Sequence, residues 1–215
     1  MTSPILLSLQ VSAAALILDI LVGTLIVYIL HRWRVPGEAV IHTICTLPLV
    51  LPPVVTGFFL LLLCNPTYLP GAILKELGLS PLFTPYGAAL AAAVIAFPLY
   101  YQTLRTAIES VDTAAQDAAR LLGAGEWTVF RRITLPMAKK GICTAVILSF
   151  TRALGEFGAT MLIAGNIPGY TQTMPLAIYF SVEQGDYGTA LTYVLWIIAI
   201  TFCLLYTIRN SKKLA

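Results

Sequence analysis

Five long apolar runs constrain this chain more than any other feature. They span residues 4–30, 41–63, 86–104, 140–165 and 187–208. A helix crosses a hydrocarbon layer of roughly 30 Å with about 20 predominantly apolar residues. The 215-residue chain is 58% apolar and only 11% charged, too few charges to cover a soluble domain of this size. We therefore predict an all-α integral membrane protein with about five transmembrane helices, forming a single domain over residues 1–215.

Basic residues gather on one side of the predicted membrane. Short loops rich in Lys and Arg stay in the cytoplasm, which places the N-terminus outside and the C-terminus inside. Lys75 falls in an outer loop and Arg152 within the bilayer. The N-terminus lacks the basic region of a cleaved signal peptide, so the first run is predicted to remain as a span. The basic residues on the predicted inner side are Arg32, Arg34, Arg105, Arg120, Arg131, Arg132, Lys139, Lys140, Arg209, Lys212 and Lys213.

Two outer segments are rich in proline and glycine. Residues 64–85 are predicted to form short turns around an amphipathic stretch at 72–79. Residues 166–186 contain an apolar stretch, 174–182, that is too short to cross the membrane. We predict that this second segment is re-entrant or interfacial, with its backbone satisfied by protein or water.

The loop at 109–140 is the longest on the predicted inner side. A helix is predicted from Asp112, as its N-cap, to Leu122, with Gly123 ending it. Gly125 then allows the chain to turn, and a second short helix covers 126–133. Pro136 is predicted to begin the next span.

Apolar side chains stand out in this otherwise cationic loop. Trp127, Val129, Phe130 and Ile133 are predicted to leave a sizeable apolar surface. Exposed apolar groups on a compact helix–turn–helix are typical of a surface that docks another protein. The alternative is an amphipathic loop lying against the membrane.

The same loop carries a long motif. Permeases of ABC importers have a cytoplasmic signature of the form E-A-A-x3-G-x9-I-x-L-P. This chain has Asp117-Ala118-Ala119, then three residues, Gly123, nine residues, and Ile133-Thr134-Leu135-Pro136. Every spacing fits, and Asp for the first Glu is the one departure. The chain therefore resembles the permease subunits of type I, binding-protein-dependent ABC importers, and the resemblance implies their fold.

That resemblance implies a division of labour among subunits. The loop would be the coupling helix, which sits in a groove of a cytoplasmic ATPase subunit. The implied partners are a second copy of the chain, two ATPase subunits, an external oxyanion-binding protein and membrane lipid, without nucleic acid, in a bacterial or archaeal cell membrane. The chain has no GxxxxGK[ST] phosphate loop, so ATP and Mg would be bound by the ATPase and no cofactor by this chain. Residues expected at the docking contact are Asp117, Ala118, Ala119, Leu122, Gly123, Ala124, Gly125, Trp127 and Phe130.

Two further stretches bear on the substrate. LPLVLPPVVTG at 47–57 resembles the second span of molybdate permeases. Residues 152–179 are similar to molybdate and sulfate/thiosulfate permeases, with the sharpest matches at 155–158 and 166–169. Thr171-Gln172-Thr173 favours molybdate, whereas Asp186-Tyr187 with Ala190 is nearer the sulfate branch. We predict a molybdate or tungstate importer, with a sulfate/thiosulfate permease as the alternative.

The second predicted span contains adjacent prolines. Pro52 and Pro53 remove two backbone donors and must bend or open this helix. An opened helix near the midplane of a transporter can line a cavity, although a kink beside a neighbouring helix is an alternative. Together with Thr56 and Phe157, these prolines are candidates for lining the translocation pathway.

Charged residues inside the predicted membrane are also candidates. Arg152 and Glu156 are four apart and share a helix face, ~18–24 Å along the fourth span. The two can neutralise each other and fix the span, or Arg152 can face the pathway of a dianion while Glu156 limits its affinity. Asp19 is a third intramembrane charge. Gly155 and Gly158 predict an interruption of the span here.

Two other classes of function fit the sequence less well. An intramembrane enzyme would use Glu156 or Asp19 as acid/base, but no His/Asp/Ser cluster accompanies them. An ATP-independent channel or secondary transporter would leave the loop motif unexplained. The four cysteines are scattered without CxxC spacing, so we predict packing roles for them and no metal site.

Overall fold

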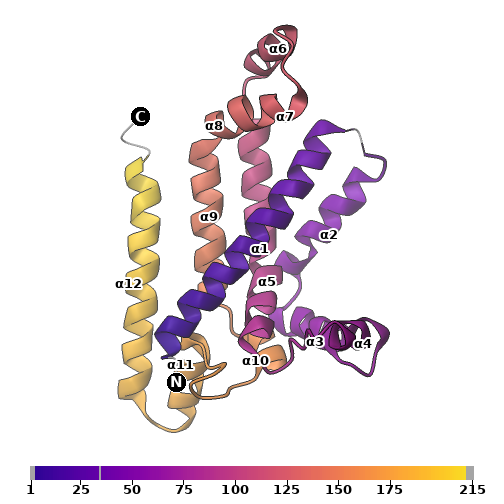
Figure 1. Ribbon diagram of the computed structural model, residues 1–215. Coiled ribbons are helices and arrows are strands. Elements are labelled where there is room, and N and C mark those ends of the chain that lie inside the picture. Colours follow the sequence, from indigo (N-terminus) through magenta and orange to yellow (C-terminus); the bar gives the residue numbers. More distant parts are fainter. Residues whose placement is uncertain (1–2, 34, 212–215) are drawn as a thin grey trace.

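The computed structural model describes residues 3–33 and 35–211, with side chains described to residue 207 at the C-terminal end. Within these ranges all regular secondary structure is helical (Figure 1), which confirms the predicted class. Arg34, Lys212 and Lys213 lie outside the described residues. The helices are α1 (Pro4–Arg32), α2 (Glu38–Val50), α3 (Pro53–Cys64), α4 (Leu69–Glu76), α5 (Pro85–Glu109), α6 (Thr113–Leu121), α7 (Glu126–Val129), the π-helix η1 (Phe130–Thr134), α8 (Leu135–Met137), α9 (Lys139–Leu154), α10 (Gly158–Ala164), α11 (Met174–Glu183) and α12 (Tyr187–Ser211).

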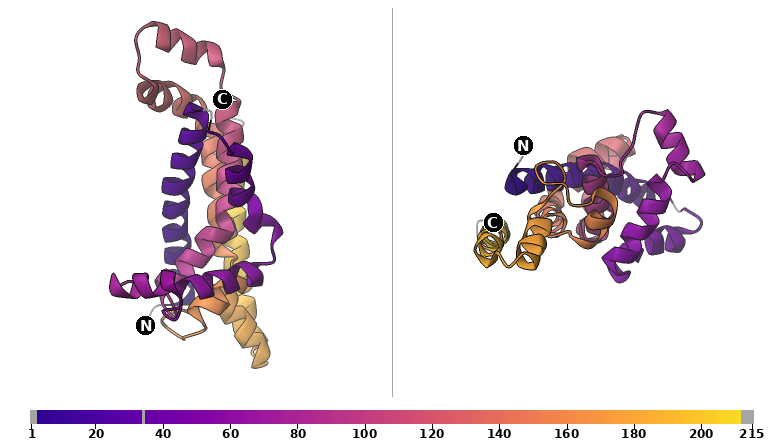
Figure 2. Two further views of the ribbon diagram at one scale, coloured as in Figure 1. Left: turned by 90° about the vertical axis from the view of Figure 1, so that its right-hand side faces the viewer. Right: turned by 90° about the horizontal axis from the view of Figure 1, so that it is seen from below.

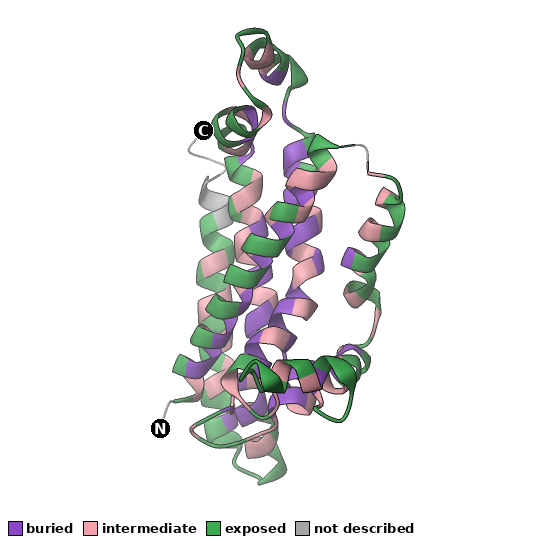
Figure 3. Ribbon diagram, turned by 45° about the vertical axis from the view of Figure 1, so that its right-hand side comes forward, coloured by how far each residue is buried: buried purple, intermediate pink, exposed green. Residues whose placement is uncertain are grey.

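Helix α5 lies at the centre of the bundle, between α1 and α9. Seven of its alanines are buried, and such small side chains let neighbouring helices approach closely. On α1, a Cβ added at Gly23 would lie 2.7 Å from the ring of Tyr100. The hydroxyls of Thr24 and Tyr100 are 3.0 Å apart. Buried residues therefore concentrate on α5 and on the faces turned toward it (Figure 3).

In the described part of the chain, three helices (α1, α5 and α12) are each long and apolar enough to cross a membrane, and two bent helix pairs raise the number to as many as five. This agrees with the predicted five spans. Most of α12 is exposed in the single chain (Figure 3), so its apolar side chains are available to lipid or to another protein. Which end of the bundle faces the cytoplasm remains a prediction from the basic residues.

The bend predicted at the adjacent prolines is present, and it divides residues 41–63 between two helices. α2 ends at Val50, α3 begins at Pro53, and the two are bent by 116°. A residue before proline is driven out of the helical region, and both Leu51 (ψ 140°) and Pro52 (ψ 135°) are extended. As a result α3 and α4 run crosswise to the long helices (Figure 2).

The fourth predicted span is interrupted, as the glycines indicated. α9 ends at Leu154 and α10 begins at Gly158. The start of this span differs from the prediction. The helical path that begins with α7 continues through η1 and α8 to Met137, past Pro136, and bends by 76° before α9 begins at Lys139.

The two candidate sites lie at opposite ends of the bundle. Helices α6, α7 and α8 gather at one end, while α3, α4, α10 and α11 gather at the other (Figure 1). The long helices α1, α5, α9 and α12 run between the two ends (Figure 1). Any action of one site on the other must therefore pass along the helices of this bundle.

Candidate functional site

The helix α6 is bounded by the two residues that the sequence indicated. Asp112 accepts a hydrogen bond from the backbone N–H of Ala114 at 2.9 Å, which confirms it as the N-cap. Gly123 follows the end of the helix with φ +83° and no neighbour within 4 Å of where a Cβ would sit. Only glycine adopts this conformation at low cost. Gly125 has φ −67°, which other residues adopt as well, so the turn depends on Gly123.

Arg120 joins α6 to α7 across this turn. Its guanidinium donates to Asp117 Oδ1 at 2.6 Å and to Glu126 Oε1 at 2.9 Å. The bond from Arg120 lowers the pKa of the Glu126 carboxyl, and both carboxylates raise the pKa of Arg120. These side chains are partly exposed, so each pair contributes modestly. Together they restrict the angle between the two short helices.

Helix α6 stands clear of the bundle (Figure 2) and ends in two large, exposed apolar side chains. Leu121 and Leu122 are each 89% exposed, and Ala118 beside them is also exposed. Exposed large apolar groups on an otherwise polar element mark an interaction site. Ala119 and Ala124 are half-buried, whereas Asp117 is exposed.

Phe130 does not belong to the exposed surface, so that prediction is wrong. Phe130 and Val129 are 3% and 2% exposed. The Phe130 ring lies 4.7 Å from the ring of Tyr28 and packs in the same core cluster as Leu104. Trp127 is 57% exposed, with its ring 5.2 Å from Tyr28. Phe130 therefore anchors the loop, while Trp127 remains partly available.

At the opposite end, an ion pair occupies the break between α9 and α10. Arg152 Nη1 donates to Glu156 Oε2 at 2.9 Å, and Glu156 Oε1 accepts the backbone N–H of Ala159 at 2.9 Å. The Glu156 side chain is 2% exposed and that of Arg152 is 30% exposed. Glu156 therefore both neutralises Arg152 and caps α10, and Arg152 keeps further donors within reach of solvent.

Helix α3 packs closely against α10. A Cβ added at Gly57 would lie 2.6 Å from Ala159 Cα, and one added at Gly158 would lie 3.2 Å from Pro53 Cβ. Thr56 is buried, and its hydroxyl has no hydrogen-bond partner among the described residues. Two breaks that are distant in sequence, one made by prolines and one by glycines, thus lie side by side.

The remaining pathway candidates border this contact. The Phe157 ring lies 5.2 Å from that of Tyr179 on α11, which links the break to the 166–186 segment. Pro52 is exposed at the bend between α2 and α3. The structure therefore brings Pro53 together with the break at Glu156 and Phe157. It leaves Pro52 at the edge of the group.

Comparison with known proteins places these features in a family. The family described as binding-protein-dependent transport system inner membrane component matches residues 20–211. The chain belongs to this family. Its match includes the whole docking loop and both helix breaks, and it leaves out only the first turns of α1 and the last residues of the chain.

Individual relatives cover almost the same extent. The chain is 42% identical over 211 residues to the putative molybdenum transport system permease protein YvgM of Bacillus subtilis, covering 98% of this chain and 93% of the relative. It is 43% identical over 189 residues to the molybdenum transport system permease protein ModB of Escherichia coli K12, covering 86% and 82%. Relatives named as sulfate permeases are less similar, at 32% and 36%.

A solved structure supports the fold. The chain superposes on the MetNI methionine ABC transporter in an inward-facing conformation with a TM-score of 0.70, covering 95% of this chain and 90% of that one. Identity is 15%, so the similarity concerns the fold alone. This similarity to a solved structure supports the type I permease fold that the loop motif implied.

Two features of this permease-family chain were not predicted from the sequence. Ser149 Oγ donates to Asp19 Oδ2 at 2.6 Å, and Asp19 is 1% exposed. The third intramembrane charge, Asp19, is therefore bonded to Ser149 of α9. Ser149 lies three residues before Arg152 on α9. That helical spacing could have indicated Ser149 as a polar residue within the same span. Leu121 was also missed, although its place beside Leu122 at the helix end is a usable signal.

Proposed function

We propose that this chain is the membrane-spanning permease subunit of an ATP-driven importer that carries molybdate, or the closely related tungstate, delivered by an external binding protein. The observation that carries the proposal is similarity to relatives named as molybdenum permeases, at 40–43% identity over most of the chain. Similarity to sulfate permeases is lower, so sulfate/thiosulfate transport is the second candidate.

In this proposal α6 is the element that docks on a cytoplasmic ATPase. The exposed Leu121 and Leu122 would enter an apolar groove, and Ala118 permits close approach of the partner surface. The φ of +83° at Gly123 sets the shape of the turn that follows. ATP and Mg would be bound entirely by the ATPase, because this chain has no phosphate-binding loop.

The assembly would contain two copies of the chain. One chain with a single docking helix cannot enclose a central pathway, and a two-fold homodimer is the commonest closed arrangement. Two copies present two docking helices to two ATPase subunits. In the orientation expected from the basic residues, the 166–186 segment of each copy faces the external binding protein.

The pathway would run beside the contact between α3 and α10. Its lining would come from Pro52, Pro53, Thr56, Arg152, Glu156 and Phe157. Arg152 and Glu156 together carry no net charge, yet Arg152 keeps donors exposed. A dianion would then meet hydrogen-bond donors without being trapped by an uncompensated cation, which a conducting site requires.

Reconstitution tests this function. The chain is co-expressed with a P-loop ATPase subunit, reconstituted into liposomes, and supplied with the external binding protein and radiolabelled molybdate. We expect uptake that requires ATP, the ATPase and the binding protein, and no ATP hydrolysis by the isolated chain. Uptake without the ATPase, or hydrolysis by the chain alone, would overturn the permease assignment. A preference for sulfate over molybdate would overturn only the substrate.

A further inference from the structure

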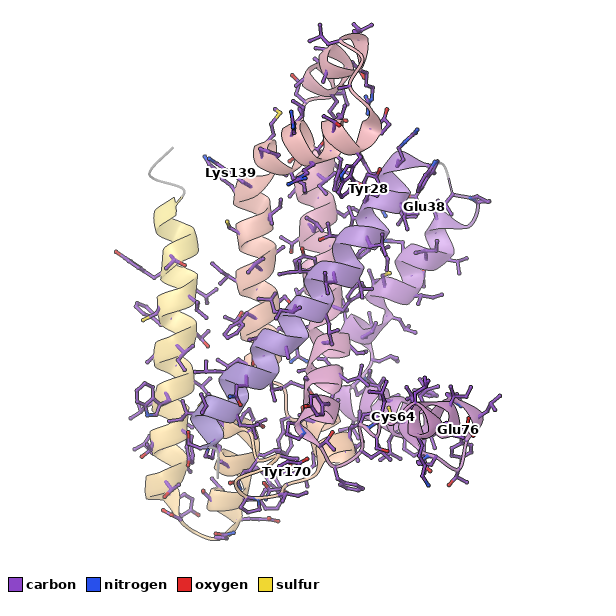
Figure 4. All side chains as sticks on the ribbon, viewed as in Figure 1. Tyr28, Glu38, Cys64, Glu76, Lys139 and Tyr170 are labelled. Atoms are coloured by element: carbon purple, nitrogen blue, oxygen red, sulfur yellow. The ribbon has the colours of Figure 1, made fainter. Side chains whose placement is uncertain are left out.

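Helix α1 contacts the docking loop at one of its ends. The Tyr28 ring lies 5.2 Å from the Trp127 ring in an edge-to-face arrangement and 4.7 Å from the Phe130 ring. Figure 4 shows Tyr28 on α1 directly beside the loop. Aromatic pairs at these separations attract each other beyond the burial of their surface. The end of α1 therefore moves with α7 and η1.

The same helix contacts α11 at its other end. The backbone N–H of Met174 donates to Ser8 Oγ at 2.7 Å, and both residues are buried, at 0% and 2% exposure. Met174 is the first residue of α11, and its N-cap, Thr173, makes no side-chain capping bond. An unbonded N–H at a buried helix start is costly. Ser8 supplies the missing acceptor from 166 residues away in the chain.

Between its ends, α1 is fastened to the centre of the bundle. Asp19 accepts the buried hydrogen bond from Ser149 of α9. Gly23 leaves no space between α1 and the Tyr100 ring of α5. These contacts prevent α1 from sliding independently of its neighbours, so a displacement applied at one end is transmitted along the helix.

The covalent route from the loop into α9 is bent. It passes through the π-helix η1 and the 76° bend before α9. On its other side the loop continues from α5, which ends at Glu109. The ring contacts with Tyr28 attach the loop to a third helix, and each added attachment opposes pivoting of the loop against the bundle.

We propose that α1 transmits movement of the docking loop to the 166–186 segment, and that Tyr28 and Ser8 are the positioning residues at its two ends. The inference rests on the proposed function in that it takes α6 as the site where the ATPase acts. When the ATPase displaces α6 and α7, Tyr28 carries α1 with them. Ser8 then carries α11, whose Tyr179 contacts the ring of Phe157 at the helix break.

The test measures coupling in the reconstituted complex. Tyr28→Ala and Ser8→Ala are compared with the native complex for ATP hydrolysed and molybdate imported. Tyr28→Phe keeps the ring, and Leu21→Ala removes a 64% exposed side chain from the same helix. We expect Tyr28→Ala and Ser8→Ala to retain ATP hydrolysis while molybdate imported per ATP falls by about 2- to 30-fold, the range for residues within a coupling network. Both controls should keep the native ratio.

Several results would overturn the proposal. One is an unchanged ratio in both alanine variants, and another is an equal fall in the Leu21→Ala control. If Tyr28→Ala does not assemble with the ATPase, Tyr28→Leu keeps apolar volume without the ring and must give the lowered ratio.

A second readout separates this inference from the proposed function. A cysteine introduced as Tyr170→Cys, with the four native cysteines replaced by serine, reports the 166–186 segment through its reaction with a polar maleimide. ATP should change the labelling rate in the Leu21→Ala background but not with Tyr28→Ala. If the native complex imports no oxyanion, the substrate assignment fails, while the labelling still decides the role of α1. Equal ATP-dependent labelling in the Leu21→Ala and Tyr28→Ala backgrounds would refute a role of α1 in transmitting movement.

Discussion

The ion pair at the break between α9 and α10 permits a quantitative test. The perturbations are Arg152→Gln, Glu156→Gln and the double variant. The structure gives a 2.9 Å contact in which one side chain is 2% exposed and the other 30% exposed. Gln at 156 still offers an amide oxygen to the N–H of Ala159, so the helix cap is retained, while the charge and the acceptor that faces Arg152 are lost.

The magnitude follows from the geometry. At an effective dielectric constant of about 20, two unit charges 2.9 Å apart attract by about 6 kcal/mol. Taking Glu156 out of water offsets much of this attraction, and the exposed part of Arg152 is screened by solvent. A net coupling between the two side chains of about 1–3 kcal/mol remains. Each single variant should therefore lose more unfolding free energy than a substitution that breaks no ion pair.

The assay is a double-mutant cycle on the free energy of unfolding in detergent, run beside molybdate uptake. We expect the double variant to lose less unfolding free energy than the two single variants lose together. The difference is the coupling energy. Uptake should stay low whenever Arg152 is absent, because Gln offers a dianion one neutral amide in place of the charged guanidinium. Additive losses would refute a stabilising pair, and full recovery of uptake in the double variant would refute a pathway role for Arg152.

Five further substitutions, one of them a control, separate fold from function. Gly123→Pro should abolish uptake while the protein still inserts, because proline fixes φ near −65° where the structure has +83°; Gly125→Ala, at φ −67°, is the control and should transport normally. Phe130→Ala should cost about 3–5 kcal/mol of stability, whereas Leu122→Ala should change stability by less than about 0.5 kcal/mol and instead reduce ATPase co-purification. Gly57→Ala should destabilise by about 1–3 kcal/mol through overpacking against Ala159, seen as a lower melting temperature.

The helix breaks could be predicted from the sequence, but their angles could not. Adjacent prolines exclude a continuous helix whatever surrounds them. The direction taken after the break depends on a tertiary contact, because the chain turns by 116° where α3 can pack its Gly57 against Ala159 of α10. Those two residues are about a hundred positions apart, and no local pattern records that they meet.

In the docking loop, too, the backbone could be predicted but the burial of the side chains could not. Asp112 and Gly123 indicated the helix cap and the turn, since both act on backbone groups within a few residues. The sequence did not indicate which of the loop's apolar side chains are buried. Phe130 and Leu122 are equally apolar in the sequence, yet one is 3% exposed and the other 89%. Phe130 is covered because Tyr28 of α1 and the core cluster that contains Leu104 of α5 lie against it.

Helix α6 explains why such a loop can stay folded while exposing so much apolar surface. A nine-residue helix is marginal by itself, and α6 has little contact with the bundle. Its stability must come from the Asp112 cap, the Gly123 turn and the Arg120 contacts to α7, all of which are local. The two leucines are therefore not needed to fold the helix. Burying each would yield about 1.5–3 kcal/mol, and this free energy is released only when a partner covers them.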